Sequence, residues 1–109
     1  MISYFEKYRT ELEDLCKTHH VLRLYAFGSV LTRRFKKGSD VDLIVAFDNN
    51  VKVSFLKNFF GLVNDLEHLF GRKVDLMEEK PIRNPVLREE IEKTKRLIYH
   101  GKKSEEMAV

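Results

Sequence analysis

The spacing of hydrophobic positions changes along the chain and predicts its first two elements. Apolar residues recur at helical intervals over residues 3–17, where Ser3 and Glu6 also have the spacing of a capping box. Residues 21–27 form a short apolar run rich in strand-forming side chains, and Gly28 ends this run. The pattern therefore predicts an amphipathic helix followed by a strand.

The central part of the chain contains its longest periodic segment. Residues 52–70 place apolar side chains on a broad helical stripe, which Gly71 ends. Such a stripe indicates burial against a sheet, and the alternative is that part of it docks another subunit. Before this helix, residues 40–47 are mostly apolar on both faces, which predicts a buried strand, and residues 30–35 predict a short helical piece.

The last third of the chain adds a third and a fourth predicted strand. Residues 73–77 and 96–99 are short runs of strand-forming residues. Between them, Asn84 and Pro85 have the order of an N-cap and a first helical position, which predicts a short helix through Ile91. Strands and helices in this order predict an α/β (α+β) fold, with a small mixed β-sheet flanked by helices.

Length and composition limit the class of protein. With 109 residues, of which 43% are hydrophobic and 34% charged, the chain predicts one soluble domain over residues 1–100 and a frayed polar tail over residues 101–109. No uncharged apolar run approaches the roughly 20 residues that a membrane span needs. The first six residues lack the basic flank and apolar stretch of a secretory signal, so we expect a cytoplasmic protein that does not bind membranes.

We expect the cysteine and the histidines to have structural roles rather than roles in catalysis or metal binding. Cys16 is the single cysteine of the chain, and we expect it on the buried side of the first helix as a small hydrophobe. The histidines have no metal-ligand spacing among themselves, so we expect surface roles or satisfied core roles for them. These histidines are His19, His20, His68 and His100.

The charge of the chain is mildly basic, with a formal net charge of +3. Much of the excess comes from Arg33, Arg34, Lys36 and Lys37, which are either a solvated loop or a basic rim that attracts a triphosphate. The surplus is small, and the chain has neither an RNA-reading motif nor a helix with a continuous basic face. We therefore expect no direct binding of nucleic acid.

Three aspartates supply the candidate chemistry. Asp40 and Asp42 are one residue apart on a predicted strand, so their side chains point to the same face and can share a ligand. Close carboxylates resist joint ionisation unless a cation neutralises them, and oxygen ligands suit Mg²⁺ or Mn²⁺ rather than zinc. Asp75 lies in an otherwise apolar strand, where a lone carboxylate would be costly to bury, and it is the expected third ligand.

Gly28 and Ser29 precede the aspartates and suit a phosphate group. Glycine lets the backbone approach a phosphate closely, and the N–H groups and hydroxyl at Ser29 can donate to it at the start of a short helix. Phosphoryl and nucleotidyl transfer need a triphosphate held in line with an attacking oxygen, often by two metal ions roughly 4 Å apart. The five residues therefore predict a site for divalent ions that carry phosphates, and two such ions are expected.

This constellation resembles the DNA polymerase beta-like nucleotidyltransferase superfamily. The hallmark of that superfamily is Gly-Ser, an intervening segment, Asp-x-Asp and a third carboxylate on a later strand. The chain is similar, within it, to the minimal nucleotidyltransferase (MNT) proteins of prokaryotes, over residues 21–99. The segments that carry the resemblance are residues 25–29, 38–45, 74–77, 84–88 and 98–99.

The resemblance implies an activity and a partner. Many minimal nucleotidyltransferases are antitoxins that transfer AMP from ATP to a tyrosine hydroxyl of a HEPN-domain toxin. By this analogy Asp40, Asp42 and Asp75 hold Mg²⁺ at the catalytic site, while Gly28 and Ser29 hold the nucleotide. Base choice, the acceptor residue, the number of nucleotides transferred and homo-oligomerisation stay open.

Two other functions compete with this one. The chain could neutralise a toxin by binding alone, or it could transfer a nucleotide to a small molecule. The small-molecule function usually needs extra residues to build an acceptor pocket, which a chain of 109 residues leaves little room for.

Overall fold

The computed structural model describes residues 3–32, 35–36, 38–79 and 83–102. The tail predicted over residues 101–109 therefore lies outside the described residues from position 103 onward. The helices are α1 (Ser3–Glu6), α2 (Arg9–Thr18), the 3₁₀ helix η1 (Gly28–Leu31), α3 (Phe55–Phe70) and α4 (Pro85–Thr94). The strands are β1 (Val21–Phe27), β2 (Val41–Phe47), β3 (Val74–Glu78) and β4 (Arg96–His100).

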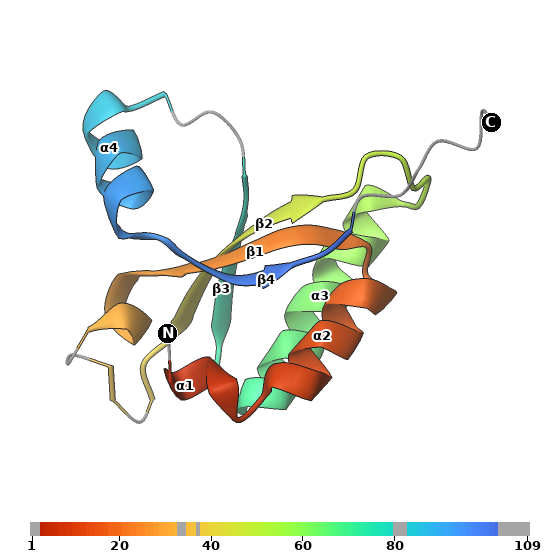
Figure 1. Cartoon of the computed structure of the whole chain (residues 1–109), viewed down its shortest axis with the longest axis horizontal. Coiled ribbons are helices and arrows are strands. Elements are labelled where there is room, and N and C mark those ends of the chain that lie inside the picture. Colours follow the sequence, from red (N-terminus) through yellow and green to blue (C-terminus); the bar gives the residue numbers. More distant parts are fainter. Residues whose placement is uncertain (1–2, 33–34, 37, 80–82, 103–109) are drawn as a thin grey trace.

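The four strands form one mixed sheet in the order β3-β2-β1-β4. Strand β1 is antiparallel to both of its neighbours, whereas β2 and β3 are parallel and are joined through α3. A parallel pair needs such a crossover connection. Helices α1, α2 and α3 lie together on one side of the sheet, and α4 lies apart from them (Figure 1). The predicted mixed sheet flanked by helices is confirmed.

The hydrophobic core lies between the sheet and helices α2 and α3. Leu43 and Val45 of β2 and Leu62 and Leu66 of α3 are fully buried, and each such leucine stabilises the fold by about 1.5–3 kcal/mol. Cys16 of α2 is also fully buried, as predicted, and its burial raises the pKa of the thiol to about 12. The thiol is therefore protonated at neutral pH and serves packing.

The N-terminal helix departs from the prediction, because residues 3–17 form two helices rather than one. The break falls at Tyr8, whose amide donates to the Phe5 carbonyl at 3.1 Å in a tight turn. Tyr4, Phe5 and Tyr8 then all pack against Phe70 at the end of α3, with ring centroids 5.1–5.8 Å apart. Aromatic packing between elements overrides the helical period here.

Two other predicted helices begin at different residues. The helical piece expected over residues 30–35 is instead η1, which begins at Gly28 and ends at Leu31. Helix α3 begins at Phe55 rather than at residue 52, after a turn in which the Val51 amide donates to the Asp48 carbonyl at 3.3 Å. Its end is as predicted, since Gly71 has the left-handed conformation with φ of 63°.

The start of α4 confirms the predicted N-cap. The side-chain oxygen of Asn84 accepts hydrogen bonds from the amides of Val86 and Leu87, at 3.0 and 3.2 Å. Pro85 occupies the first helical position, where its missing N–H has no partner to lose.

The apolar stripe of α3 is buried only in its C-terminal half. Leu62 and Leu66 are fully buried, whereas Phe55, Leu56 and Phe60 are 46%, 64% and 62% exposed. The expected burial against the sheet is therefore confirmed for one half of the helix. Docking of another subunit on the exposed half stays a prediction.

His19 has a structural role, as expected. Its Nε2 lies 2.7 Å from an Asp65 carboxylate oxygen, and its Nδ1 lies 3.2 Å from the side-chain oxygen of Asn58. The side-chain Nδ2 of Asn58 also donates to the His19 backbone carbonyl at 2.6 Å. These contacts join the end of α2 to α3.

Candidate functional site

Asp42 lies at the junction of β1, η1 and β2. It pairs in register with Phe27, the last residue of β1, so the next residue, Gly28, comes directly against its carboxylate. A Cβ atom at Gly28 would lie 2.6 Å from Oδ2 of Asp42, and Gly28 has a positive φ of 75°. Glycine is therefore required here for two reasons, the backbone conformation and the space that the carboxylate occupies.

Asp75 lies directly beside Asp42 on the neighbouring strand. The two residues are register partners in the parallel pair of β2 and β3, and adjacent strands lie about 4.8 Å apart. Side chains of register partners project from the same face of a sheet. The structure thus brings the third acid, from a distant part of the sequence, to the Asp-x-Asp segment.

The reason given for Asp75 from the sequence is wrong, however. Its side chain is exposed, whereas Val74, which precedes it on the same strand and faces the other way, is buried. No burial cost therefore marks this carboxylate, and its proximity to Asp42 is the observation that remains.

Asp40 completes the acidic group at the start of β2. It is exposed and precedes Val41, whose amide donates to the Lys73 carbonyl at 3.0 Å. Burial raises the pKa of the Asp42 carboxyl above its ordinary value, and the charges of Asp75 and Asp40 raise it further. Both carboxylates therefore lie close enough to oppose the ionisation of Asp42.

The donor set fits a hard divalent cation. Three carboxylates that repel one another are stabilised by a shared cation, and oxygen ligands suit Mg²⁺ or Mn²⁺. Within the described ranges, no group of three or more acidic, histidine or cysteine side chains already has metal-binding geometry. The carboxylates of Asp40, Asp42 and Asp75 are neighbours, and they would have to move closer to one another to bind one cation.

The predicted phosphate-binding residues and basic rim are only partly described. Ser29 is the second residue of η1, directly after Gly28, and its contact with a phosphate stays a prediction. Lys36 is exposed, whereas Arg33, Arg34 and Lys37 lie outside the described residues.

Arg72 is a residue near the site that the sequence analysis missed. It lines a hollow beside Asp40, and its Nη1 atom donates to the backbone carbonyls of Lys36 and Ser39 at 2.6 and 3.0 Å. An arginine after a helix-ending glycine matches no motif, so nothing in the sequence pointed to it.

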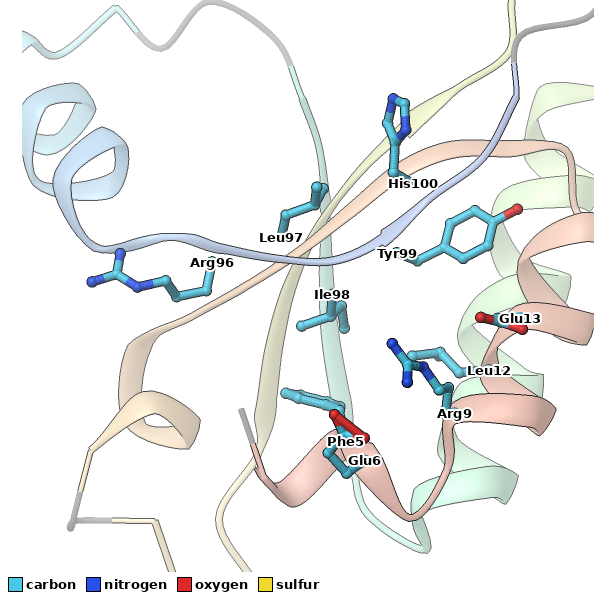
Figure 2. Close-up of a pocket in the computed structure, with 10 residues that line it drawn as sticks. All are labelled: Phe5, Glu6, Arg9, Leu12, Glu13, Arg96, Leu97, Ile98, Tyr99 and His100. Carbon is cyan, nitrogen blue, oxygen red and sulfur yellow. The ribbon is translucent and has the colours of Figure 1, made fainter. Parts of the chain in front are cut away.

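Figure 2 shows the residues that line a second hollow, of about 290 Å³. It is bounded by α1 and α2 on one side and by β4 on the other, and β4 is the edge strand opposite β3. Its lining residues are Phe5, Glu6, Arg9, Leu12, Glu13, Arg96, Leu97, Ile98, Tyr99 and His100. None of the three aspartates contributes to it, so we assign the chemistry to the acidic group instead.

Comparison with known proteins identifies the family of the chain. The profile of the family described as "Polymerase beta, Nucleotidyltransferase" matches residues 10–104, a range that includes all five predicted site residues. A Methanocaldococcus jannaschii protein named "Putative protein adenylyltransferase MJ1379" is 37% identical to the chain over 93 residues. The match covers 85% of this chain and 87% of that relative.

None of the helices in the described ranges is long and apolar enough to cross a membrane.

A solved structure described as a "putative minimal nucleotidyltransferase" is 30% identical, with a TM-score of 0.67, and the match covers 87% of this chain and 93% of the other. A complex described as a tri-AMPylated Shewanella oneidensis HEPN toxin with MNT antitoxin contains a chain of the same fold. That chain is 16% identical, with a TM-score of 0.56, over 85% of this chain and 70% of its own length.

These matches confirm both the predicted fold class and the resemblance that the Gly-Ser and Asp-x-Asp segments suggested. Sequence and structure lead to one conclusion: the chain belongs to the Polymerase beta, Nucleotidyltransferase family.

Proposed function

We propose that the chain is a Mg²⁺-dependent protein adenylyltransferase that transfers AMP from ATP to a tyrosine hydroxyl of a HEPN toxin and thereby acts as an antitoxin. The observation that carries this proposal is the pairing of Asp42 with Asp75 beside Asp40, next to a glycine that leaves room for the carboxylate. The name of the M. jannaschii relative and the AMPylated toxin in the S. oneidensis complex support the choice of AMP and of a protein acceptor.

The proposed reaction forms one bond and breaks one bond. The acceptor oxygen bonds to the α-phosphorus of ATP, the bond from that phosphorus to the pyrophosphate oxygen breaks, and the hydroxyl proton leaves to a base or to water. AMP is then joined to the acceptor, and pyrophosphate is released.

Each residue of the site has a role in this proposal. Asp40 and Asp42 would together hold Mg²⁺, and Asp75 would complete the metal site. Bound Mg²⁺ or Mn²⁺ supplies a lowered pKa for the attacking hydroxyl and neutralises charge on the triphosphate. Gly28 keeps the Asp42 carboxylate at the end of β1, and the backbone and hydroxyl of Ser29 bind phosphate.

The openness of the site favours a protein as the acceptor. Asp40 and Asp75 are both exposed, and β3 lies at the edge of the sheet. A large partner can therefore bring a hydroxyl to the carboxylates from the open side of the sheet. In this proposal the protein works in the cytoplasm.

Intact mass spectrometry tests the proposal. The purified chain is incubated with ATP, Mg²⁺ and the HEPN protein encoded beside it, and we expect the partner to gain one or more AMP units. The Asp42→Asn variant should give no gain. A folded partner whose mass stays unchanged with the wild-type chain would contradict the proposed activity.

Toxicity measurements test the antitoxin role separately. Co-expression with the partner should relieve its toxicity only when Asp40 and Asp42 are both intact. Equal protection by the Asp40→Ala and Asp42→Ala variants would instead assign neutralisation to binding alone. Resistance to a small-molecule drug conferred by the chain alone would assign a small-molecule acceptor.

A further inference from the structure

The segment that leads into Asp40 is held in a defined turn. The Ser39 amide donates to the Lys36 carbonyl at 3.0 Å, and the Ser39 hydroxyl accepts from the Lys36 amide at 3.0 Å. Gly38 supplies the positive φ of 92° within this turn. These local bonds shape the turn, but they do not attach it to the rest of the fold.

Arg72 makes that attachment from the connection between α3 and β3. Its Nη1 atom donates to the carbonyls at both ends of the turn, Lys36 at 2.6 Å and Ser39 at 3.0 Å. The next residue, Lys73, accepts a hydrogen bond from the Val41 amide at 3.0 Å. The residues on either side of Asp40 are therefore both bonded to the Arg72–Lys73 segment.

Aromatic rings hold the guanidinium in place. The guanidinium carbon of Arg72 lies 4.2 Å from the ring centroid of Phe35 and 5.5 Å from that of Tyr4. The Tyr4 and Phe35 rings pack edge to face, with centroids 4.8 Å apart. Cation–π contacts with two rings orient the planar group toward the two carbonyls.

Asp40 depends on this backbone support. Its side chain is exposed, and among the described residues its carboxylate makes no hydrogen bond or ion pair. Its position relative to Asp42 and Asp75 therefore rests on the segment that carries it.

We propose that Arg72 is a positioning residue for Asp40, which holds the first carboxylate of the site in place through the turn before it. This inference rests on the proposed function, since it assigns Asp40 to the Mg²⁺ site. Arg72 acts on Asp40 through the turn, because its Nη1 donates to the carbonyls at both ends of that turn.

The test compares Arg72→Met and Arg72→Lys with the wild-type chain. Methionine keeps much of the aliphatic stem over the rings and removes the donors, whereas lysine retains a charge that can reach one carbonyl. With Mg²⁺ and a non-hydrolysable ATP analogue as probes, calorimetry should show affinity about 10- to 100-fold weaker for Arg72→Met. Arg72→Lys should be intermediate, and Arg9→Ala, an exposed arginine of α2, should match wild type.

The Mg²⁺ dependence of transfer separates positioning from loss of folded protein. A displaced Asp40 raises the Mg²⁺ concentration needed for half-maximal activity, and saturating Mg²⁺ restores much of the rate. A lower folded fraction would reduce the rate at every Mg²⁺ concentration and leave the half-maximal concentration unchanged, which would overturn the inference. Equal probe binding by Arg72→Met and wild type would also overturn it, whereas no binding by wild type would contradict the proposed function itself.

Discussion

Asp42 lies where β1, β2 and β3 meet, with the Gly28 backbone on one side and Asp75 on the other. Its pKa is raised by burial and by the charges of Asp75 and Asp40. The ionised carboxylate that a metal ion needs is therefore unfavourable for the fold when no cation is bound. Function and stability conflict at this residue.

Replacing Asp42 by asparagine should stabilise the metal-free protein at neutral pH. The raised pKa means that the folded state binds more protons than the unfolded state between the two pKa values, so stability falls as pH rises through the folded pKa. Asp42→Asn removes that loss. In EDTA, the melting temperature of this variant should exceed that of wild type at pH 7. The difference should disappear at a pH low enough to protonate the Asp42 carboxyl in both the folded and the unfolded state. Calorimetry over pH checks this, with the exposed Asp14→Asn as a control that shows no such difference.

Gly28 should tolerate no side chain. Alanine at this position is strained at φ of 75°, by about 1–2 kcal/mol, and its Cβ would also displace the Asp42 carboxylate. We expect Gly28→Ala to lower both the free energy of unfolding and the affinity for Mg²⁺ with nucleotide, measured by denaturation and calorimetry. Gly71→Ala has a similar φ of 63° and no atom within 4 Å of its Cβ, so it should lower stability alone. Equal effects on affinity would contradict this explanation.

At the scale of elements, the sequence predicted the features that depend on residues close together in the chain. The run over residues 21–27 coincides with β1, Gly71 ends α3, and Asn84 caps α4. The break between α1 and α2 could not be predicted in this way, because it depends on rings that pack against Phe70 from another part of the chain.

The N-cap of α4 gives a prediction at this scale. Asn84→Ala removes the acceptor for the Val86 and Leu87 amides and should cost about 1 kcal/mol of unfolding free energy. Asn84→Ser keeps an acceptor and should recover most of that loss. Urea denaturation of the two variants checks the difference, and equal stability of Asn84→Ala and wild type would contradict the cap.

At the scale of the whole molecule, the topology of the sheet explains why Asp42 and Asp75 lie side by side. The crossover from β2 through α3 makes β3 parallel to β2, and the register then sets Asp75 beside Asp42. Sequence spacing predicted that a third acid comes from another strand of the sheet. It predicted neither the exposed edge position of Asp75 nor the contact of Arg72 with the Lys36 and Ser39 carbonyls, because strand order and loop packing are set by tertiary contacts.

The same global packing divides α3 into two halves. Leu62 is fully buried, whereas Phe60 is 62% exposed, although they are close in sequence. Leu62→Ala should cost about 2–5 kcal/mol of unfolding free energy, and Phe60→Ala should change it by about 0.5 kcal/mol or less. Denaturation of both variants measures the contrast, and a larger loss for Phe60→Ala would show that the helix is oriented differently.

A crystal of the chain grown with Mn²⁺ and a non-hydrolysable ATP analogue tests the central claim most directly. Anomalous scattering should place manganese between Asp40 and Asp42, with an Asp75 carboxylate oxygen within bonding distance and the triphosphate on the metal. Manganese bound elsewhere, or an Asp75 side chain turned away from it, would contradict the account.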